Sequence, residues 1–125
     1  DKSGKSVGFT YLIANTDIYR SDAGVEFAVK TACDFYGGIE DSDGLSEKVK
    51  SVLANKEFEY NQYGDPHCLI EHNGVYCMLH FGAKTPKVYE FTGFNLYSKA
   101  SLQAGIYSAA KNDNWYRKIY SELYE

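Results

Sequence analysis

One short pair of residues constrains this fold more than any other feature of the sequence. Asn73-Gly74 lies between two runs, residues 68–72 and 75–81, in which a mostly apolar set of side chains alternates with a mixed polar and aromatic set. A type I′ turn needs positive φ at both central positions, and Asn and Gly adopt that conformation at low cost. The pattern therefore predicts an antiparallel hairpin whose register is fixed by a two-residue turn.

The predicted register gives the hairpin two unlike faces, with Met78 opposite Leu69 and His80 opposite His67. One face is mostly apolar and should pack against a helix; it carries Cys68, Ile70, His72, Val75, Cys77 and Leu79. The other face is a mixed set that we expect to be solvated; it carries His67, Leu69, Glu71, Tyr76, Met78 and His80.

A helical periodicity precedes the hairpin. Its apolar residues recur at intervals of three and four, and they are Val25, Ala28, Val29, Ala32, Cys33 and Tyr36. Ser21 or Asp22 can cap the start, because a short side-chain oxygen accepts from the N–H groups of the first turn. Gly37-Gly38 ends the helix, because Gly enters the left-handed region cheaply. A shorter second helix is predicted from Leu45, Val49, Val52 and Leu53.

Alternating patterns elsewhere predict the remaining strands. They are residues 7–14, 57–61, 87–91 and 102–107, whereas the tail from 115 to 125 fits a strand or a short helix equally well. Helices that precede most of the strands are typical of the α+β class. We expect a single domain over residues 1–125, with one main helix packed on a twisted antiparallel β-sheet and a second, short helix.

Composition and charge exclude several classes of protein. Hydrophobic residues make up 44% and charged residues 24% of the 125 residues, which is typical of a globular domain and not of a disordered chain. No apolar run approaches the ~18 residues of a membrane span. The formal charge is −4, which argues against a protein whose main task is to neutralise phosphates. Aromatic residues are frequent at 16%, with 12 Tyr, which favours β structure and contact surfaces.

The three cysteines, Cys33, Cys68 and Cys77, show no Cys-x-x-Cys spacing, so a zinc ribbon is not supported. In the predicted register Cys68 and Cys77 lie diagonally, roughly 7–8 Å apart. A disulfide tolerates a Cα separation of roughly 4.4–6.8 Å, so a bond between them would need a bulge. We expect buried reduced thiols, with that disulfide as the alternative.

Three segments, in this order, resemble the small secreted fungal guanyl-preferring ribonucleases. Residues 21–36 resemble the single helix of that family, and Tyr60-Asn61-Gln62-Tyr63 resembles its base-binding Tyr-Asn-Asn-Tyr segment. Residues 104–107, followed by 112–115, are similar to its last strands. The resemblance implies a microbial ribonuclease-like fold, in which one helix packs on a twisted antiparallel sheet.

The resemblance also implies where a catalytic site would lie. Members of the family cleave RNA with a carboxylate, two histidines and an arginine, accompanied by a tyrosine. Here Lys56 stands at the position of the tyrosine and Phe58 at that of the first histidine. Met78 stands at the position of the carboxylate, Lys87 at that of the arginine and Ala109 at that of the second histidine. General acid–base catalysis needs titratable groups within hydrogen-bond reach of the moving proton, and Phe, Met and Ala have none. The expectation is a pseudo-ribonuclease without catalytic residues, metal or cofactor.

In lacking these catalytic residues, the sequence resembles the ribonuclease-like secreted effectors of cereal powdery mildew fungi, which keep the fold without its catalytic residues. The resemblance implies a virulence or avirulence protein that is secreted and then translocated into the cytoplasm of the host cell. Its partners would be a host plant protein or an intracellular plant immune receptor, and RNA in some cases. It also implies a monomer without a membrane partner.

Two sets of residues are candidates for binding. The candidate RNA-binding set is Tyr60, Asn61, Gln62, Tyr63 and Asp65, because base stacking on aromatic rings tolerates any sequence. The candidate protein-binding set is Trp115, Tyr116, Arg117 and Tyr120, because such residues dominate interface hot spots. The alternative for the second set is that it covers an edge of the core.

The alternative function is an RNA-binding protein or a weakly active ribonuclease with a shifted site. His67, Glu71 and His80, with Tyr76 beside them, could form a new acid–base cluster on the mixed face of the hairpin. The simpler interpretation is a solvated sheet face whose side chains titrate without function. A third hypothesis is an unrelated α+β interaction domain.

Overall fold

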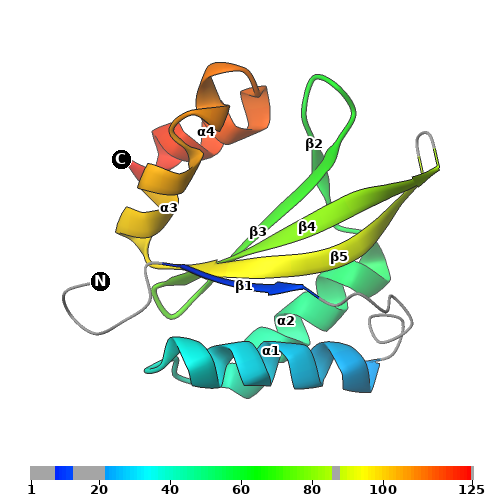
Figure 1. Cartoon of the computed structure of the whole chain (residues 1–125), viewed down its shortest axis with the longest axis vertical. Helices are drawn as coiled ribbons and strands as arrows, with labels where there is room; N and C mark the ends of the chain where they lie inside the picture. The colour runs from blue at the N-terminus through cyan, green and yellow to red at the C-terminus, as the bar shows by residue number, and fades with distance from the viewer. Residues whose placement is uncertain (1–7, 13–21, 86–87, 125) are drawn as a thin grey trace.

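An antiparallel sheet lies between two layers of helices (Figure 1). The computed structural model describes residues 8–12, 22–85 and 88–124. The strands are β1 Gly8–Leu12, β2 Glu59–Tyr60, β3 Pro66–His72, β4 Val75–Thr85 and β5 Val88–Tyr97, in the order β1-β5-β4-β3-β2. The helices are α1 Asp22–Tyr36, α2 Ser42–Asn55, α3 Lys99–Ile106 and α4 Asn114–Leu123, with a 3-10 turn η2, Ala109–Lys111, between the last two. The predicted α+β class is confirmed.

The hairpin has the predicted turn and register. Asn73 and Gly74 both have positive φ, of 50° and 82°, and His72 faces Val75 across the turn. Leu69 faces Met78 farther along the strands. Strand β4 then continues past the predicted residue 81 to Thr85, and β5 runs to Tyr97, well beyond the predicted residue 91.

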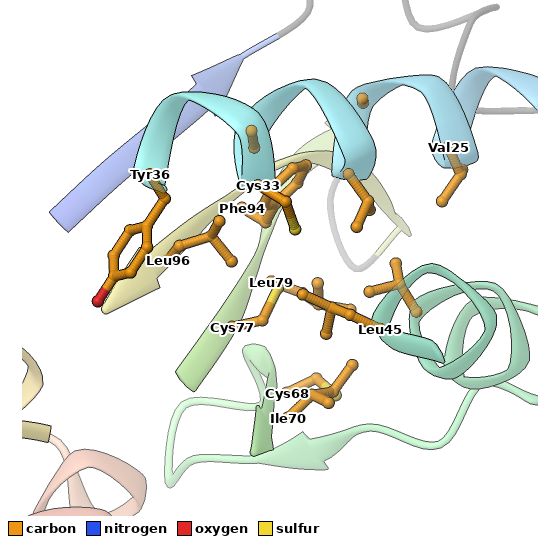
Figure 2. Close-up of a cluster of buried hydrophobic side chains, with 14 residues drawn as sticks. Val25, Cys33, Tyr36, Leu45, Cys68, Ile70, Cys77, Leu79, Phe94 and Leu96 are labelled. Atoms are coloured by element: carbon orange, nitrogen blue, oxygen red, sulfur yellow. The ribbon is translucent and has the colours of Figure 1, made fainter. Parts of the chain in front are cut away.

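The first core lies between this sheet and the helices α1 and α2 (Figure 2). All six residues of the predicted apolar face of the main helix are buried there, together with Leu45 and Val49 of α2, so both predicted helices are confirmed. The strands contribute the apolar hairpin face and two residues of β5, Phe94 and Leu96. Figure 2 shows these side chains converging from the helices α1 and α2 and from the sheet. Gly37 and Gly38 end α1 with φ of 81° and 73°, as expected.

The second core, on the opposite face of the sheet, corrects two predictions. Residues 102–106 of the predicted strand 102–107 belong to helix α3. For the tail, the short helix is the alternative that the structure contains, as helix α4. Leu102 and Ile106 are four residues apart, so they share one helix face. These helices bury Met78 and pack on the mixed face of the hairpin, which is therefore covered rather than solvated.

Some predicted features lie outside the described residues. They are Ser21 as a helix cap, Lys87, and the ends of the predicted strand 7–14, of which Gly8–Leu12 is strand β1. Strand β1 pairs antiparallel with β5, and Gly8 faces Tyr97. In the described part of the chain, no helix is both long and apolar enough to cross a membrane.

Candidate binding site

A hollow of about 620 Å³, lined mostly by aromatic side chains, lies beyond the end of α2. We call it the aromatic pocket; its described lining residues are Leu53, Lys56, Phe58, Tyr60, Tyr63, Gly64, Pro66, Phe81, Tyr89 and Phe91. They come from α2, from the segment after it, and from four neighbouring strands, β2 to β5. Its volume lies within the range of roughly 300–1,000 Å³ typical of small-molecule sites.

A β-bulge in β5 directs two aromatic rings into this pocket. The register pairs Leu79 with Phe94 and Phe81 with Phe91, so two steps along β4 match three steps along β5. Strict alternation from Phe94 would put residue 92 on the pocket side. The extra residue puts Phe91 there instead, and Tyr89 with it. Bulges commonly re-aim side chains next to functional sites.

The rings of the pocket are held in place by their neighbours. Phe58 and Phe81 have centroids 4.7 Å apart, and Phe81 lies 6.1 Å from Phe91. The hydroxyl of Tyr89 donates to Asp65 Oδ1 at 2.9 Å, and this hydrogen bond is the main reason that the pKa of Tyr89 is raised. Tyr60 and Tyr63 are 60% and 69% exposed, so the mouth of the pocket presents two large rings to solvent.

The structure divides the candidate RNA-binding set between two tasks. Tyr60 and Tyr63 line the pocket. Asn61 is buried, and its Oδ1 accepts from the backbone N–H groups of Tyr63 and Asp65, so it shapes the loop. Because Asn61 and Asp65 use their polar atoms inside the protein, two exposed aromatic rings remain as the part of the set available to a ligand.

The same loop is hydrogen-bonded to the start of α4, and we call these contacts the loop–helix clip. Gln62 donates from Nε2 to the carbonyl of Asn112 at 2.8 Å and accepts from the N–H of Asn114 at 2.9 Å. Asn61 Nδ2 donates to Asp113 Oδ2 at 2.6 Å. Gln62 is therefore a structural residue, and the wall of the aromatic pocket is coupled to the second helical layer.

Asp113 joins the clip to a histidine. It caps α4 by accepting from the N–H groups of Trp115 and Tyr116, and its other oxygen lies 3.4 Å from His67 Nε2. Burial would raise the pKa of Asp113, but the hydrogen bonds from Asn61 and from the helix N–H groups lower it on balance. Burial lowers the pKa of His67 despite this carboxylate, and the ring stacks on Trp115 with centroids 4.5 Å apart.

The predicted acid–base cluster is only partly assembled. His80 lies on the same sheet face, its Nε2 is 3.0 Å from Asn95 Oδ1, and burial lowers its pKa. Glu71 is not a member, because it accepts from the N–H of Gly74 at the hairpin turn. Asp113 is the carboxylate that contacts His67, and sequence analysis missed it. Its signal was a helix-capping Asp ahead of the apolar spacing Trp115, Ile119 and Leu123.

The positions aligned with the ribonuclease catalytic residues do not converge. Lys56 and Phe58 line the aromatic pocket, whereas Met78 is buried in the second core on the other face of the sheet. Ala109 lies in η2 between the helices of the second layer. Lys87 lies outside the described residues. The segment aligned with the family's last strands is helical here, which is why Ala109 does not lie in a strand.

The candidate protein-binding set lies largely in or against the second core. Trp115 is 3% exposed, and its Nε1 donates to Glu59 at 2.8 Å. Tyr116 packs against the same core, and Arg117 donates to the carbonyls of Ala110 and Lys111. Tyr120 packs partly on the core and partly on neighbouring tyrosines. The interpretation that this set covers the core is therefore the correct one for Trp115 and Tyr116.

The three cysteines are free and buried in the first core. Burial raises the pKa of Cys33 and of Cys68 to about 11, and it raises the pKa of Cys77 further. The described residues contain no cluster of three or more His, Cys, Asp or Glu side chains arranged to hold a metal ion.

Comparisons with known proteins add no assignment to this geometry. No family model, no curated protein and no solved structure matches the chain.

Proposed function

We propose that this protein acts by binding and not by catalysis. The observation that supports the proposal is the composition of the aromatic pocket. Its described lining contains neither a carboxylate nor an imidazole, thiol or aliphatic hydroxyl, and Lys56 is its single charged side chain. Such a site can enclose and stack on a ligand, but it lacks the carboxylate and the imidazole groups with which the ribonucleases that the sequence resembles transfer protons.

The resemblance drawn from the sequence supplies the biological setting of the proposal. A secreted fungal effector that binds a host plant protein, and is recognised by an intracellular immune receptor, needs a stable scaffold and an exposed contact surface. The chain offers both: two cores, and large exposed rings at the pocket mouth, Tyr60 and Tyr63. Exposed aromatic side chains around an apolar hollow are typical of interaction sites.

The second candidate is the shifted ribonuclease or RNA-binding site, and the contact between His67 and Asp113 favours it. A carboxylate that orients a histidine is a common element of acid–base sites. His80 would supply the second imidazole. Against it, the side chains of His67 and Asp113 are only 13% and 14% exposed, which restricts access for a polynucleotide.

Incubation of the purified protein with total RNA between pH 5 and pH 8 separates the two candidates. The binding proposal predicts no cleavage above that of a buffer control. Cleavage by the wild type that disappears in both His67→Gln and His80→Gln, with the exposed Tyr124→Ala unchanged, would establish the second candidate instead. A calorimetric titration with single-stranded RNA at two salt concentrations then measures binding without cleavage.

A further inference from the structure

We propose that the aromatic pocket is a specific site for a small planar aromatic acid, a flat ring system that carries one carboxylate. The inference rests on the proposal that the domain acts by binding, and it names the chemical class of one ligand. Nothing in the hypothesis of a host protein partner requires such a site.

The walls of the pocket select a flat ring. Six of the ten described lining residues are aromatic, from Phe58 and Tyr60 after α2 to Tyr89 and Phe91 of β5. Aromatic pairs prefer offset-stacked or edge-to-face arrangements, with centroids about 4.5–7 Å apart. Phe58 and Phe81 already meet in this way, with centroids 4.7 Å apart and a tilted interplanar angle of 58°. An aliphatic ligand would fill the volume without these ring contacts.

The charge at the rim selects an anion. The protein has a formal charge of −4, yet the one charged residue among the described residues of the pocket lining is a cation, Lys56. Within the described ranges Lys56 forms no salt bridge with an acidic side chain. The carboxylate of Asp65, on the neighbouring loop, is bonded to Tyr89 and to Asn61. The ammonium of Lys56 is therefore left for a ligand.

The backbone holds Lys56 where the pocket needs it. Lys56 is the C-cap of α2 in the left-handed conformation, with φ of 52°, and its N–H donates to the carbonyl of Val52. A non-Gly residue with positive φ is uncommon, and Gly or Asn would satisfy this position with less strain. The lysine is thus not the residue that the cap alone would favour.

The site is also built from a specific strand irregularity. The bulge opposite His80 and Phe81 is what aims Phe91 and Tyr89 into the pocket. Gly82 leaves the space that the bulge needs, because a Cβ there would lie 3.0 Å from Thr92 Cγ2. A sheet that only had to cover the first core would not need this change of alternation.

The test is an NMR titration of the full chain with three naphthalene derivatives of the same shape. They are 2-naphthoate, the neutral 2-naphthylmethanol and the cationic 2-naphthylmethylamine. We expect naphthoate to bind about two- to fivefold more tightly than the neutral alcohol, because an exposed ion pair contributes that much. The amine should bind most weakly. The shifted amide signals should belong to residues that line the pocket.

Lys56→Asn is the decisive variant, since Asn tolerates the left-handed backbone and removes the charge. It should abolish the preference for naphthoate over the alcohol, and Lys56→Arg should keep it. Lys99→Asn, at an exposed lysine outside the pocket, is the matched control and should leave the preference unchanged. Tyr60→Ala should weaken the binding of all three ligands, whereas Tyr124→Ala, at the similarly exposed tyrosine that follows α4, should weaken none.

Three results would overturn the inference. One is the absence of shifts at the pocket residues at millimolar naphthoate, and another is equal binding of the acid and the alcohol to the wild type. The third is tighter binding of guanosine monophosphate than of naphthoate at the same residues, which would make the ligand a nucleotide. None of these three results bears on RNA cleavage, so each would leave the non-catalytic proposal intact. Cleavage of RNA by the protein would overturn that proposal whether or not naphthoate binds.

Discussion

The two faces of the sheet are stabilised in different ways. The face toward α1 and α2 is held by apolar packing, with Phe94, Leu79 and Leu45 almost completely buried. The face toward α3 and α4 has a smaller core, and polar contacts to the loop after β2 help to hold it, above all those of Asp113 and Gln62. Apolar packing is non-directional and tolerates relaxation, whereas the loop–helix clip depends on particular donors and acceptors. The second face should therefore open more readily.

The largest expected loss of stability comes from truncating a buried side chain in the first core. Phe94→Ala should lower the free energy of unfolding by about 3–5 kcal/mol, because it removes a fully buried ring and leaves a cavity. Urea denaturation measures the loss. Leu102→Ala, in the second core, should cost about 2–5 kcal/mol, but hydrogen exchange should show the loss of protection mainly in α3 and α4. Equal loss of protection in α1 would contradict the difference between the two faces.

Breaking the loop–helix clip should have a smaller and local effect. Asp113→Ala removes a helix cap and the acceptor of Asn61, so we expect a cost of about 1–3 kcal/mol. Ser98→Ala removes the cap of α3 without touching the clip, and it serves as the control, with an expected cost of about 1 kcal/mol. In both variants the thiols of Cys33, Cys68 and Cys77 should stay unreactive toward a thiol reagent at pH 8, because the first core stays closed. Rapid labelling in Asp113→Ala would show that the two faces open together.

The smallest effect is a pH dependence of stability that arises on the second face. The pKa values of His67 and His80 are lowered in the folded protein, chiefly by burial, so the unfolded chain binds more protons as the pH falls. The contribution of the two histidines to the free energy of unfolding is then fully present above their unfolded pKa of about 6.5. It is lost as the pH falls from there toward their lower pKa values in the folded protein. Urea denaturation at pH 7.5 and pH 5 measures this loss. The double variant His67→Gln/His80→Gln should show a flatter profile, and an unchanged profile would assign the effect to other groups.

Local sequence patterns correctly predicted the elements on the face of the sheet toward α1 and α2. The spacing from Val25 to Tyr36 requires a helix with one apolar side, and Asn73-Gly74 requires a tight turn that fixes the strand register. Both are properties of neighbouring residues, so the sequence contains them without reference to the rest of the chain.

The pocket and the clip were only partly visible in the sequence. Tyr60 and Tyr63 were selected, but as members of a motif whose other residues turned out to shape the loop. The change of alternation between Phe91 and Phe94 was a readable sign of the bulge, because pocket-side residues in a regular strand are two or four apart, not three. Asp113 and His67 lie 46 positions apart in the numbering, and no local pattern indicates that they meet.

The sequence by itself determined the hairpin, the two helices of the first layer and the α+β class, because hydrophobic periodicity and turn chemistry act over a few residues. The tertiary structure alone decided what covers the second face and which side chains line the aromatic pocket. Those outcomes depend on contacts between segments that are distant in the chain, such as Gln62 with Asn112, and on one extra residue in β5. The position of a side chain in such a site is set by the packing of whole elements, which a local pattern does not specify.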